Sequence, residues 1–393
     1  MKTVITPEFV KNFSCIADKC EDHCCHGWDI LIDKPTYSFM TKKSDLKIKS
    51  QQVIVRTRSA ASYAKIKLDE NGVCPFREQA GLCEVHKAHG HSRLSHTCQS
   101  YPRLYNIRGE QLESSLTLSC PEAARQILLN PSAMNFHSEQ LHDNAFNAVE
   151  YERPQWYDNV RQLFIDVLLL ESLPLEERLF LLGMTLKYLD AHQSDIDDFN
   201  QTFTYCCEKI TNGEFSALYE RMNSALELHA SQLIKVFNVQ FAISVTENQS
   251  QVIKRMHLLH ELLVDAFEPA GDDVNKQKEI LLQGFNGNYQ DYFNNNSHVW
   301  LNYFIYKMYQ HDFPADNMYE VFTDIVTDFF ILRGALAAIA SQRPLQESDI
   351  ILAMQSYHRS KDHRVILSKG IKNLQKQLEV DDKMLPLMLL KMS

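Results

Sequence analysis

Eight of the ten cysteines in this 393-residue chain lie in its first third, and they form two groups. The first group has the spacing Cys15-x4-Cys20-x3-Cys24-Cys25, and the second has the spacing Cys74-x8-Cys83-x14-Cys98-x21-Cys120. Thiolates are soft donors that bind iron–sulfur clusters and zinc, and an iron–sulfur cluster usually takes four of them. The eight thiols are enough for two tetrahedral sites, so the pattern predicts a metal-binding region.

Zinc is the competing metal for these cysteines. Four histidines, a common type of zinc ligand, lie between Cys83 and Cys98: His86, His89, His91 and His96. The two close Cys-x2-Cys pairs typical of zinc sites are absent, which favours iron.

Buried free thiols or disulfides are the ordinary alternative to a metal site. In a large intracellular protein thiols stay reduced, so clustered cysteines indicate metal more often than crosslinks. The other two cysteines, Cys206 and Cys207, are adjacent in a helical context, and we expect them to be buried thiols outside the site.

The net charge and the apolar pattern restrict the function classes. The formal net charge is -10, so a broad electrostatic grip on nucleic acid or an anionic membrane is not expected. Residues 1–8 show no apolar run followed by a cleavage site, and no later stretch approaches the length of a membrane span. The sequence therefore predicts a cytoplasmic protein that binds neither nucleic acid nor membrane.

The segments that must position the cysteines change character near residue 125. Before it, Ile30 and Ile32 alternate with polar neighbours, as do Val53 and Val55, which indicates short strands in an irregular region organised by metal. We predict a cysteine-rich iron–sulfur or zinc domain over residues 1–125. Residues 126–393 would form a helical body that recognises the substrate.

Helical patterns dominate after Cys120. Pro121 and Glu122 start a helix, with proline in the first turn and a carboxylate at the positive end. Apolar residues at helical spacing then recur from Val160 to Leu168, from Leu179 to Leu186 and from Tyr319 to Phe330. The predicted fold class is mainly α, with a multi-helix body.

Four runs surround the cysteines: Cys20-x3-Cys24-Cys25, Cys74-Pro75-Phe76, Gly81-Leu82-Cys83-Glu84-Val85-His86 and Cys98-Gln99-Ser100-Tyr101-Pro102-Arg103. Together they resemble a zinc- or iron-chelating domain found in many small bacterial proteins. Further features are Phe13-x-Cys15, His26-Gly27-Trp28-Asp29-Ile30, Leu116-Thr117-Leu118-Ser119-Cys120-Pro121 and Trp300-Leu301-Asn302-Tyr303. With them the chain resembles the flagellin lysine-N-methylases along most of its length, most specifically in the first 125 residues.

The resemblance implies a protein-lysine N-methyltransferase that transfers methyl groups from S-adenosylmethionine to flagellin and holds a 4Fe-4S cluster. No Gly-x-Gly occurs in the chain, so a Rossmann-type methyltransferase domain is not expected. Cys20-x3-Cys24 begins the Cys-x3-Cys-x2-Cys motif of radical enzymes, but Gly27 stands in the third position. The sequence leaves both polar and radical methyl transfer open.

Five residues near the cysteines are candidates for contact with substrate or cofactor. Trp28 and Arg103 would bind the cofactor, through cation–π contact with its sulfonium and ion pairing with its carboxylate. Tyr37, Tyr101 and Asp29 are the catalytic candidates, as acceptors of the lysine proton. Core packing of the rings and a turn role for the aspartate are the ordinary alternatives.

A non-enzymatic function is the alternative for the whole chain. The same cysteines would then store, deliver or sense iron or zinc as a metal or redox module, while the helical region binds a partner. A structural zinc domain attached to a helical adaptor is the third hypothesis.

Overall fold

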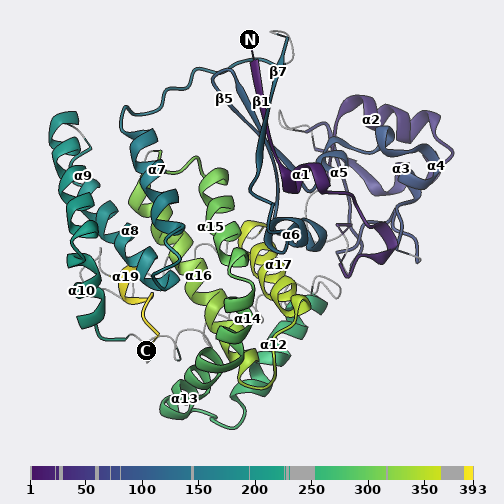
Figure 1. Cartoon of the computed structure of the whole chain (residues 1–393). Coiled ribbons are helices and arrows are strands. Elements are labelled where there is room, and N and C mark those ends of the chain that lie inside the picture. Colours follow the sequence, from purple (N-terminus) through teal and green to yellow (C-terminus); the bar gives the residue numbers. More distant parts are fainter. Residues whose placement is uncertain are drawn as a thin grey trace.

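The computed structural model describes residues 2–22, 24–25, 30–57, 62–70, 72–79, 81–142, 146–193, 195–224, 226, 230, 253–315, 317–363 and 385–392. Helices dominate these residues, and the strands described all lie before residue 142 (Figure 1). This arrangement confirms the predicted mainly α fold with short strands in the cysteine-rich region. The described sheets have no Rossmann-type order.

A mixed four-stranded sheet with the order β5-β6-β1-β7 stands at the amino-terminal end. Its strands are β1 (Lys2–Pro7), β5 (Arg103–Arg108), β6 (Gln111–Leu116) and β7 (Phe136–Leu141). β1 pairs in parallel with β6, where Val4 lies opposite Leu112, and antiparallel with β7, where Val4 lies opposite Glu139. Strand β7 lies beyond residue 125, in a segment predicted to be helical. It forms a strand because its backbone pairs with β1, the first strand of the chain.

A small lobe, which we define as residues 30–100, has an apolar core of its own that includes Ile30, Ile32 and Phe76. Its three-stranded sheet has the order β2-β4-β3, with β2 (Leu31–Ile32), β3 (Ile54–Arg56) and β4 (Ala64–Ile66). Its helical segments are α2 (Lys34–Ser38), η2 (Phe39–Lys43), α3 (Lys47–Val53), α4 (Glu84–His89), η3 (His91–Arg93) and α5 (His96–Ser100). The predicted short strands around Ile32 and Val55 are thereby confirmed.

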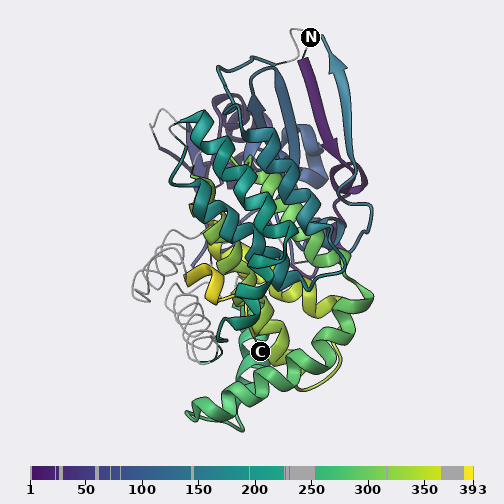
Figure 2. The ribbon, with the colours of Figure 1, turned by 60° about the vertical axis from the view of Figure 1, so that its left-hand side comes forward.

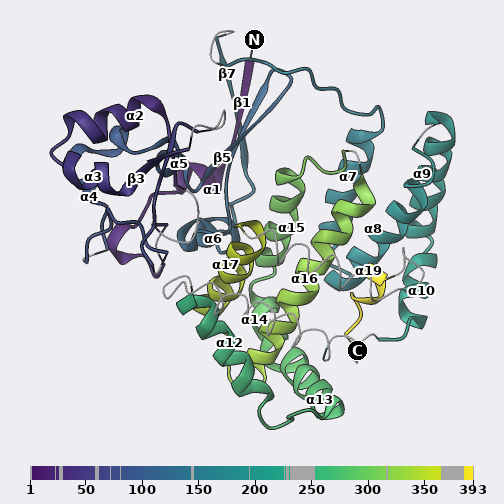
Figure 3. The ribbon, with the colours of Figure 1, turned by 180° about the vertical axis from the view of Figure 1, so that it is seen from behind.

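The remaining helical segments surround a larger core. They are α1 (Glu8–Asn12), η1 (Ala17–Lys19), α6 (Pro121–Leu128), α7 (Tyr157–Leu168), α8 (Leu175–Leu189), α9 (Ile196–Thr211), α10 (Glu214–Arg221), α12 (Ile253–Phe267), α13 (Val274–Gly284), η4 (Phe285–Tyr289), α14 (Gln290–Asn295), α15 (His298–Gln310), α16 (Met318–Ala340), α17 (Glu347–His363) and α19 (Leu385–Met388). Figures 1 and 3 show the small lobe on one side of the molecule and α8, α9 and α10 on the other, and Figure 2 shows α8 and α9 side by side. Among the described helices, none combines the length and apolarity needed to cross a bilayer.

The larger core joins the amino-terminal strand and helix to the helical body. Phe9 of α1, Leu116 of β6 and Ile127 of α6 are fully buried in the same cluster as Tyr303 of α15 and much of α16. The boundary between the two apolar cores therefore lies at the edges of the small lobe. The predicted domain boundary at residue 125 falls instead inside α6, whose buried residues belong to the larger core.

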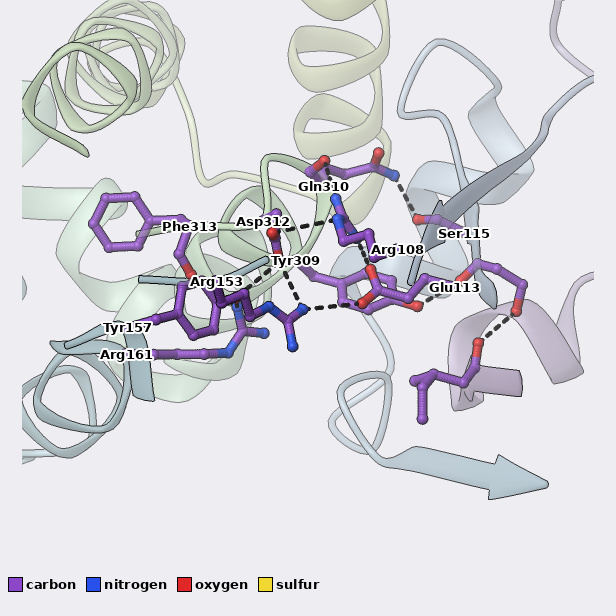
Figure 4. A network of polar contacts seen from close by, with 12 residues as sticks. Arg108, Glu113, Ser115, Arg153, Tyr157, Arg161, Tyr309, Gln310, Asp312 and Phe313 are labelled. Atoms are coloured by element: carbon purple, nitrogen blue, oxygen red, sulfur yellow. Dashed lines mark hydrogen bonds and ion pairs between the residues drawn. The ribbon is translucent and has the colours of Figure 1, made fainter. Parts of the chain in front are cut away.

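A polar network also fastens the sheet to the helical body (Figure 4). Arg108 of β5 forms ion pairs with Glu113 of β6 and with Asp312, which follows α15. Arg153 pairs with Asp312 at 2.9 Å, and the Tyr157 hydroxyl donates to the same carboxylate at 2.8 Å. Burial raises the pKa of Asp312 to about 6, although Arg108 opposes the rise. The contacts place Arg108 of β5 and Arg153, from the segment between β7 and α7, around a carboxylate that follows α15.

Helix α13 packs against α16 at a position where a side chain has no room. A Cβ on Gly284 would lie 1.8 Å from the carbonyl oxygen of Ala337. The obstacle is backbone, so the two helices must separate to accept any larger residue.

We expect Gly284→Ala to lower the free energy of unfolding by about 1–3 kcal/mol, because α13 and α16 must move apart. Urea denaturation measures this loss as a lower midpoint. The control is Gln283→Ala, an exposed position on the same helix, where a change within about 0.5 kcal/mol is expected. Equal stability of the two variants would show that the helices do not pack this closely.

Candidate functional site

Six of the eight clustered cysteines line one hollow of about 220 Å³, which we call the cysteine pocket. They are Cys15, Cys20, Cys24, Cys25, Cys83 and Cys120. Cys83 lies at the start of α4 and Cys120 at the start of α6, while the other four come from the stretch after α1. The fold thus brings thiols from three separate stretches of the chain to one place.

The other two cysteines lie beside this pocket. Cys74 is buried in the core of the small lobe, and Cys98 packs against that core. Burial raises the pKa of Cys74 to about 12, and the neighbouring Cys98 and Cys83 contribute to the rise. All eight predicted cysteines therefore gather in one region, with six on the pocket wall and two behind it.

The ionisation of these thiols favours the neutral form at most positions. Burial raises the pKa of Cys120 to about 12 and that of Cys98 to about 11. Cys24 differs, because a hydrogen bond with Cys25 lowers its pKa to about 7, and Arg359 acts in the same direction. A metal that binds here must displace the thiol protons. Its positive charge would stabilise the thiolates, which burial alone disfavours.

The cysteine pocket has the donor chemistry of a soft-metal site. A wall with six thiols suits iron–sulfur clusters or zinc better than hard cations. In the part of the chain that the structure describes, no group of three or more His, Cys, Asp or Glu side chains is already arranged around a metal position. The thiols therefore supply the donor type that a soft metal requires, and metal binding in this pocket stays a prediction.

The four histidines of the zinc hypothesis separate in the structure. His86 lines the cysteine pocket, and the ring of His91 lies 5.9 Å from the ring of His86. His89 instead pairs with Asp45 at 2.7 Å, and His96 is exposed on α5. Of these four histidines, His86 is therefore the one that lines the cysteine pocket together with the thiols.

Helix α17 of the helical body completes the cysteine pocket. Arg359 lines it and forms an ion pair with Asp22, another residue of the pocket. Gln355, one turn earlier, donates to Asp22 at 2.8 Å and to the backbone carbonyl of Ser119 at 3.0 Å. Residues from both ends of the chain therefore form one site.

A second hollow of about 470 Å³, which we call the adjoining cleft, shares Tyr101 and Pro102 with the cysteine pocket. Its wall consists of Thr97, Ser100, Tyr101, Pro102, Arg103, Leu104, Thr117, Tyr306, Lys307, Gln310, His311, Asp324, His358 and Lys361. Helices α15, α16 and α17 supply one side, and α5 with the start of β5 supplies the other. Because α17 also carries Arg359, one helix contributes to both hollows.

Beneath the adjoining cleft lies a buried carboxylate, Asp328 of α16, which is fully inaccessible. Lys307 contacts it at 3.1 Å and Lys361 at 2.5 Å. The hydroxyls of Tyr357 and Tyr303 donate to it at 2.6 and 3.3 Å. Two ammonium groups thus surround one carboxylate, and both ammonium side chains also line the cleft.

The five candidate residues fall in different places. Tyr101 lines both hollows and Arg103 lines the adjoining cleft, with its guanidinium 5.0 Å from the centre of the Phe13 ring. Trp28 and Asp29 lie outside the described residues. Tyr37 lines neither hollow.

Tyr37 lies in the small lobe, away from both hollows. Its ring packs edge-on against Tyr63 at 5.1 Å, and Arg56 lies over it. Tyr101 is placed at the site, but burial raises its pKa well above the usual value. Its hydroxyl therefore remains protonated at neutral pH and suits a hydrogen-bond donor better than a proton acceptor.

The sequence analysis missed Lys307, His358, Arg359 and Lys361. One signal was present, because Asp328 interrupts an apolar stretch of α16, where an unpaired charge would be costly. A carboxylate in that position requires cationic partners, and α15 and α17 provide them.

The fold and the two hollows define a mainly helical protein with a cysteine-lined pocket, distinct from Rossmann-type methyltransferases. The family model of the FliB lysine N-methylase C-terminal domain matches residues 161–389, and the chain belongs to this family. Residues of α15, α16 and α17 that line the hollows lie inside the matched region. No solved structure matches the chain.

Curated relatives agree with the family. A lysine-N-methylase of Salmonella typhimurium (strain LT2) is 25% identical over 394 residues, which cover 96% of this chain and 95% of that protein. A lysine-N-methylase of Salmonella choleraesuis has the same identity and coverage. The flagellar biosynthetic protein FliU of Salmonella muenchen is 38% identical over 136 residues, which cover 34% of this chain and 80% of that protein.

The buried charges make a prediction for stability. Burial alone would raise the pKa of Asp328, but Lys361, Lys307 and His358 outweigh burial and hold the pKa well below its usual range. This carboxylate therefore stabilises the fold fully above its unfolded pKa of about 3.9, and the contribution is lost as the pH falls toward the folded value.

We expect Asp328→Asn to lower the free energy of unfolding at pH 7 by about 3–5 kcal/mol, because two buried ammonium groups lose their partner. Below about pH 4 the stability of the wild type should fall as this carboxylate takes up a proton, and the variant, whose amide does not titrate, should lose less stability over the same range. Urea unfolding between pH 7 and pH 3 measures both effects. Asp265→Asn, at an exposed position of α12, is the control. An unchanged pH profile in Asp328→Asn would contradict the assignment.

Proposed function

We propose that the chain transfers methyl groups from S-adenosylmethionine to lysine side chains of flagellin, and that the cysteine pocket holds a 4Fe-4S cluster which organises the active site. Membership of the FliB lysine N-methylase family over residues 161–389 is the observation that carries the enzyme class. Near full-length similarity to two lysine-N-methylases and the partial match to a flagellar biosynthetic protein support the flagellar substrate.

The cluster is proposed from the donor set of the cysteine pocket. An iron–sulfur cluster usually takes four thiolates, and the pocket wall offers six. When bound, the cluster would brace the pocket or offer an open iron to the amino and carboxylate groups of the methionine moiety. Such thiols stay reduced in the cytoplasm, where we place the reaction.

The chain itself has to bind the lysine substrate and accept its proton. A lysine ammonium, with a reference pKa of about 10.4, must become a neutral amine before it can attack the sulfonium methyl group. In the adjoining cleft, Asp324, His311 and His358 carry groups that accept protons. Lys307 and Lys361 add positive charge, which favours the neutral form of an incoming amine.

The first test is metal retention. We expect anaerobically purified protein to contain iron and sulfide with visible absorption, and Cys20→Ser to lose both the absorption and the binding of S-adenosylmethionine. Cys207→Ser, on α9 outside the pocket, is the control and should keep them. A colourless, zinc-loaded wild type would favour a structural zinc domain. Cofactor binding in an iron-free variant would exclude direct contact with iron.

The second test is the reaction. Purified flagellin incubated with the iron-loaded protein and S-adenosylmethionine should gain mass in steps of one methyl group, with the modification located on lysines by peptide mass spectrometry. The Cys207→Ser protein should give the same modification. If wild-type protein with intact iron leaves flagellin unchanged, the enzyme assignment fails and a metal or redox module remains.

A further inference from the structure

Strand β5 forms one edge of the four-stranded sheet, because β6 is its one neighbour in the described strand order. An edge strand presents backbone N–H and C=O groups that a further strand can bind. Two consecutive side chains of β5 are exposed, Leu104 at 40% and Tyr105 at 56%. Since consecutive side chains of a strand point to opposite faces, β5 is open to solvent on both faces at this point.

The pairing of β5 with β6 shows which backbone groups of β5 point away from the sheet. Next to the first pair of the ladder, the Thr117 N–H donates to the carbonyl of Pro102, directly opposite, at 2.9 Å. Hydrogen-bonded pairs alternate with non-hydrogen-bonded pairs in an antiparallel ladder. Every second residue from Pro102 onward therefore bonds to β6, and Tyr105 and Ile107 turn their N–H and C=O groups outward. In the part of the chain that the structure describes, neither residue has a backbone partner outside the sheet.

The adjoining cleft lies against the first residues of this edge. Arg103 and Leu104 line it, together with Gln310, the last residue of α15. Arg108, on the same face of β5 as Leu104, contacts the same end of α15 by donating to the Gln310 carbonyl at 3.5 Å. A strand paired with β5 would therefore run along the rim of the cleft, with every second side chain on the cleft face.

We infer that the edge of β5 binds an extended segment of the protein substrate as an added strand, and that a lysine opposite Leu104 enters the adjoining cleft. This inference rests on the proposed function, which places the acceptors of the lysine proton in that cleft. Side chains that lie opposite each other on neighbouring strands share a face of the sheet. The lysine side chain therefore lies beside Leu104, and its flexible four-carbon stem carries the amine into the cleft.

The composition of β5 favours the substrate over a second copy of this chain as the added strand. The strand reads Arg-Leu-Tyr-Asn-Ile-Arg from Arg103 to Arg108, so two copies paired through β5 would offer the cleft no lysine. Strand addition obtains its affinity from main-chain hydrogen bonds, while pockets for side chains provide specificity. One edge can thus accept segments of different sequence, and the cleft selects those with lysine at the right position.

Backbone-methylated peptides test the inference on the iron-loaded full chain. The probe is a short flagellin peptide around a lysine that the protein methylates, synthesised with one N-methyl group at each backbone position in turn. An N-methyl group blocks pairing only where the N–H faces β5. Calorimetric titration should show binding weakened about tenfold at alternate positions, the value of one or two hydrogen bonds, and unchanged at the positions between them. Equal losses at all positions would contradict strand addition.

A second test changes the edge itself. Tyr105→Pro removes an outward N–H, and proline is tolerated on an edge strand where that N–H faces solvent. The KM for the flagellin peptide should rise about tenfold, while methylation of N-acetyl-lysine methylamide, which is too short to pair with β5, should not change. Comparison with Tyr105→Thr, which loses the ring but keeps the N–H, isolates the backbone contribution.

The matched control is a proline on the opposite edge of the sheet. The Glu8 N–H donates to the carbonyl of Asn135 at 2.8 Å, so by the same alternation the N–H of Ser138 in β7 points outward. Ser138 is exposed. Ser138→Pro should therefore keep the wild-type KM for the flagellin peptide, because β7 lies at the other side of the sheet from the cleft.

The outcomes separate this inference from the proposed function. If wild-type protein methylates flagellin but the peptides show no alternation and Tyr105→Pro equals Tyr105→Thr, the edge of β5 does not bind the substrate. If wild-type protein methylates neither flagellin nor N-acetyl-lysine methylamide, the proposed function fails as well. Sedimentation that shows a wild-type dimer and a Tyr105→Pro monomer would assign the edge to a second copy and overturn the inference. The peptide series uses wild-type protein, so its result stands however the proline variants fold.

Discussion

The arrangement of the two hollows depends on one buried carboxylate that must be neutralised. Asp328 of α16 is fully inaccessible, and its partners come from α15 and α17. Because breaking such a group of charges is costly, the three helices are held in one relative position. Helix α17 then presents Lys361 to the adjoining cleft and Arg359 to the cysteine pocket. The ion pairs of Asp328 beside the adjoining cleft therefore also fix the position of Arg359 in the wall of the cysteine pocket.

Local signals were sufficient to predict much of the helical body. Proline followed by glutamate correctly marked the start of α6, and apolar residues at helical spacing correctly marked α7, α8 and α16. Cys206 is buried, as predicted for a thiol outside the site, whereas Cys207, which was also predicted to be buried, is only half-buried. The spacing of the other cysteines indicated a common region, and six of them line one pocket. These features depend on neighbouring residues, which is why sequence patterns report them.

The features that sequence reasoning missed depend on contacts between distant segments. Strand β7 is polar and mostly exposed, so it carries no apolar alternation, and it pairs with β1 from Lys2 opposite Leu141 to Pro7 opposite Phe136, far apart in the sequence. Lys307 and Lys361 resemble ordinary solvent-facing charges until α15 and α17 place them on Asp328. The position of Tyr37 could not be predicted for the same reason, because it depends on how the small lobe packs around Tyr63.

The order of the four-stranded sheet has a consequence for synthesis on the ribosome. β1 is translated early, yet its neighbours are residues 111–113 of β6 and residues 136–141 of β7. At about 5–20 residues per second, roughly 7–27 s pass before both neighbours have been made. During that interval β1 has unpaired edges, and the thiols after α1 lack Cys83 and Cys120. For that interval the nascent chain exposes an unpaired strand edge, which favours aggregation, and accessible thiols, which are open to oxidation.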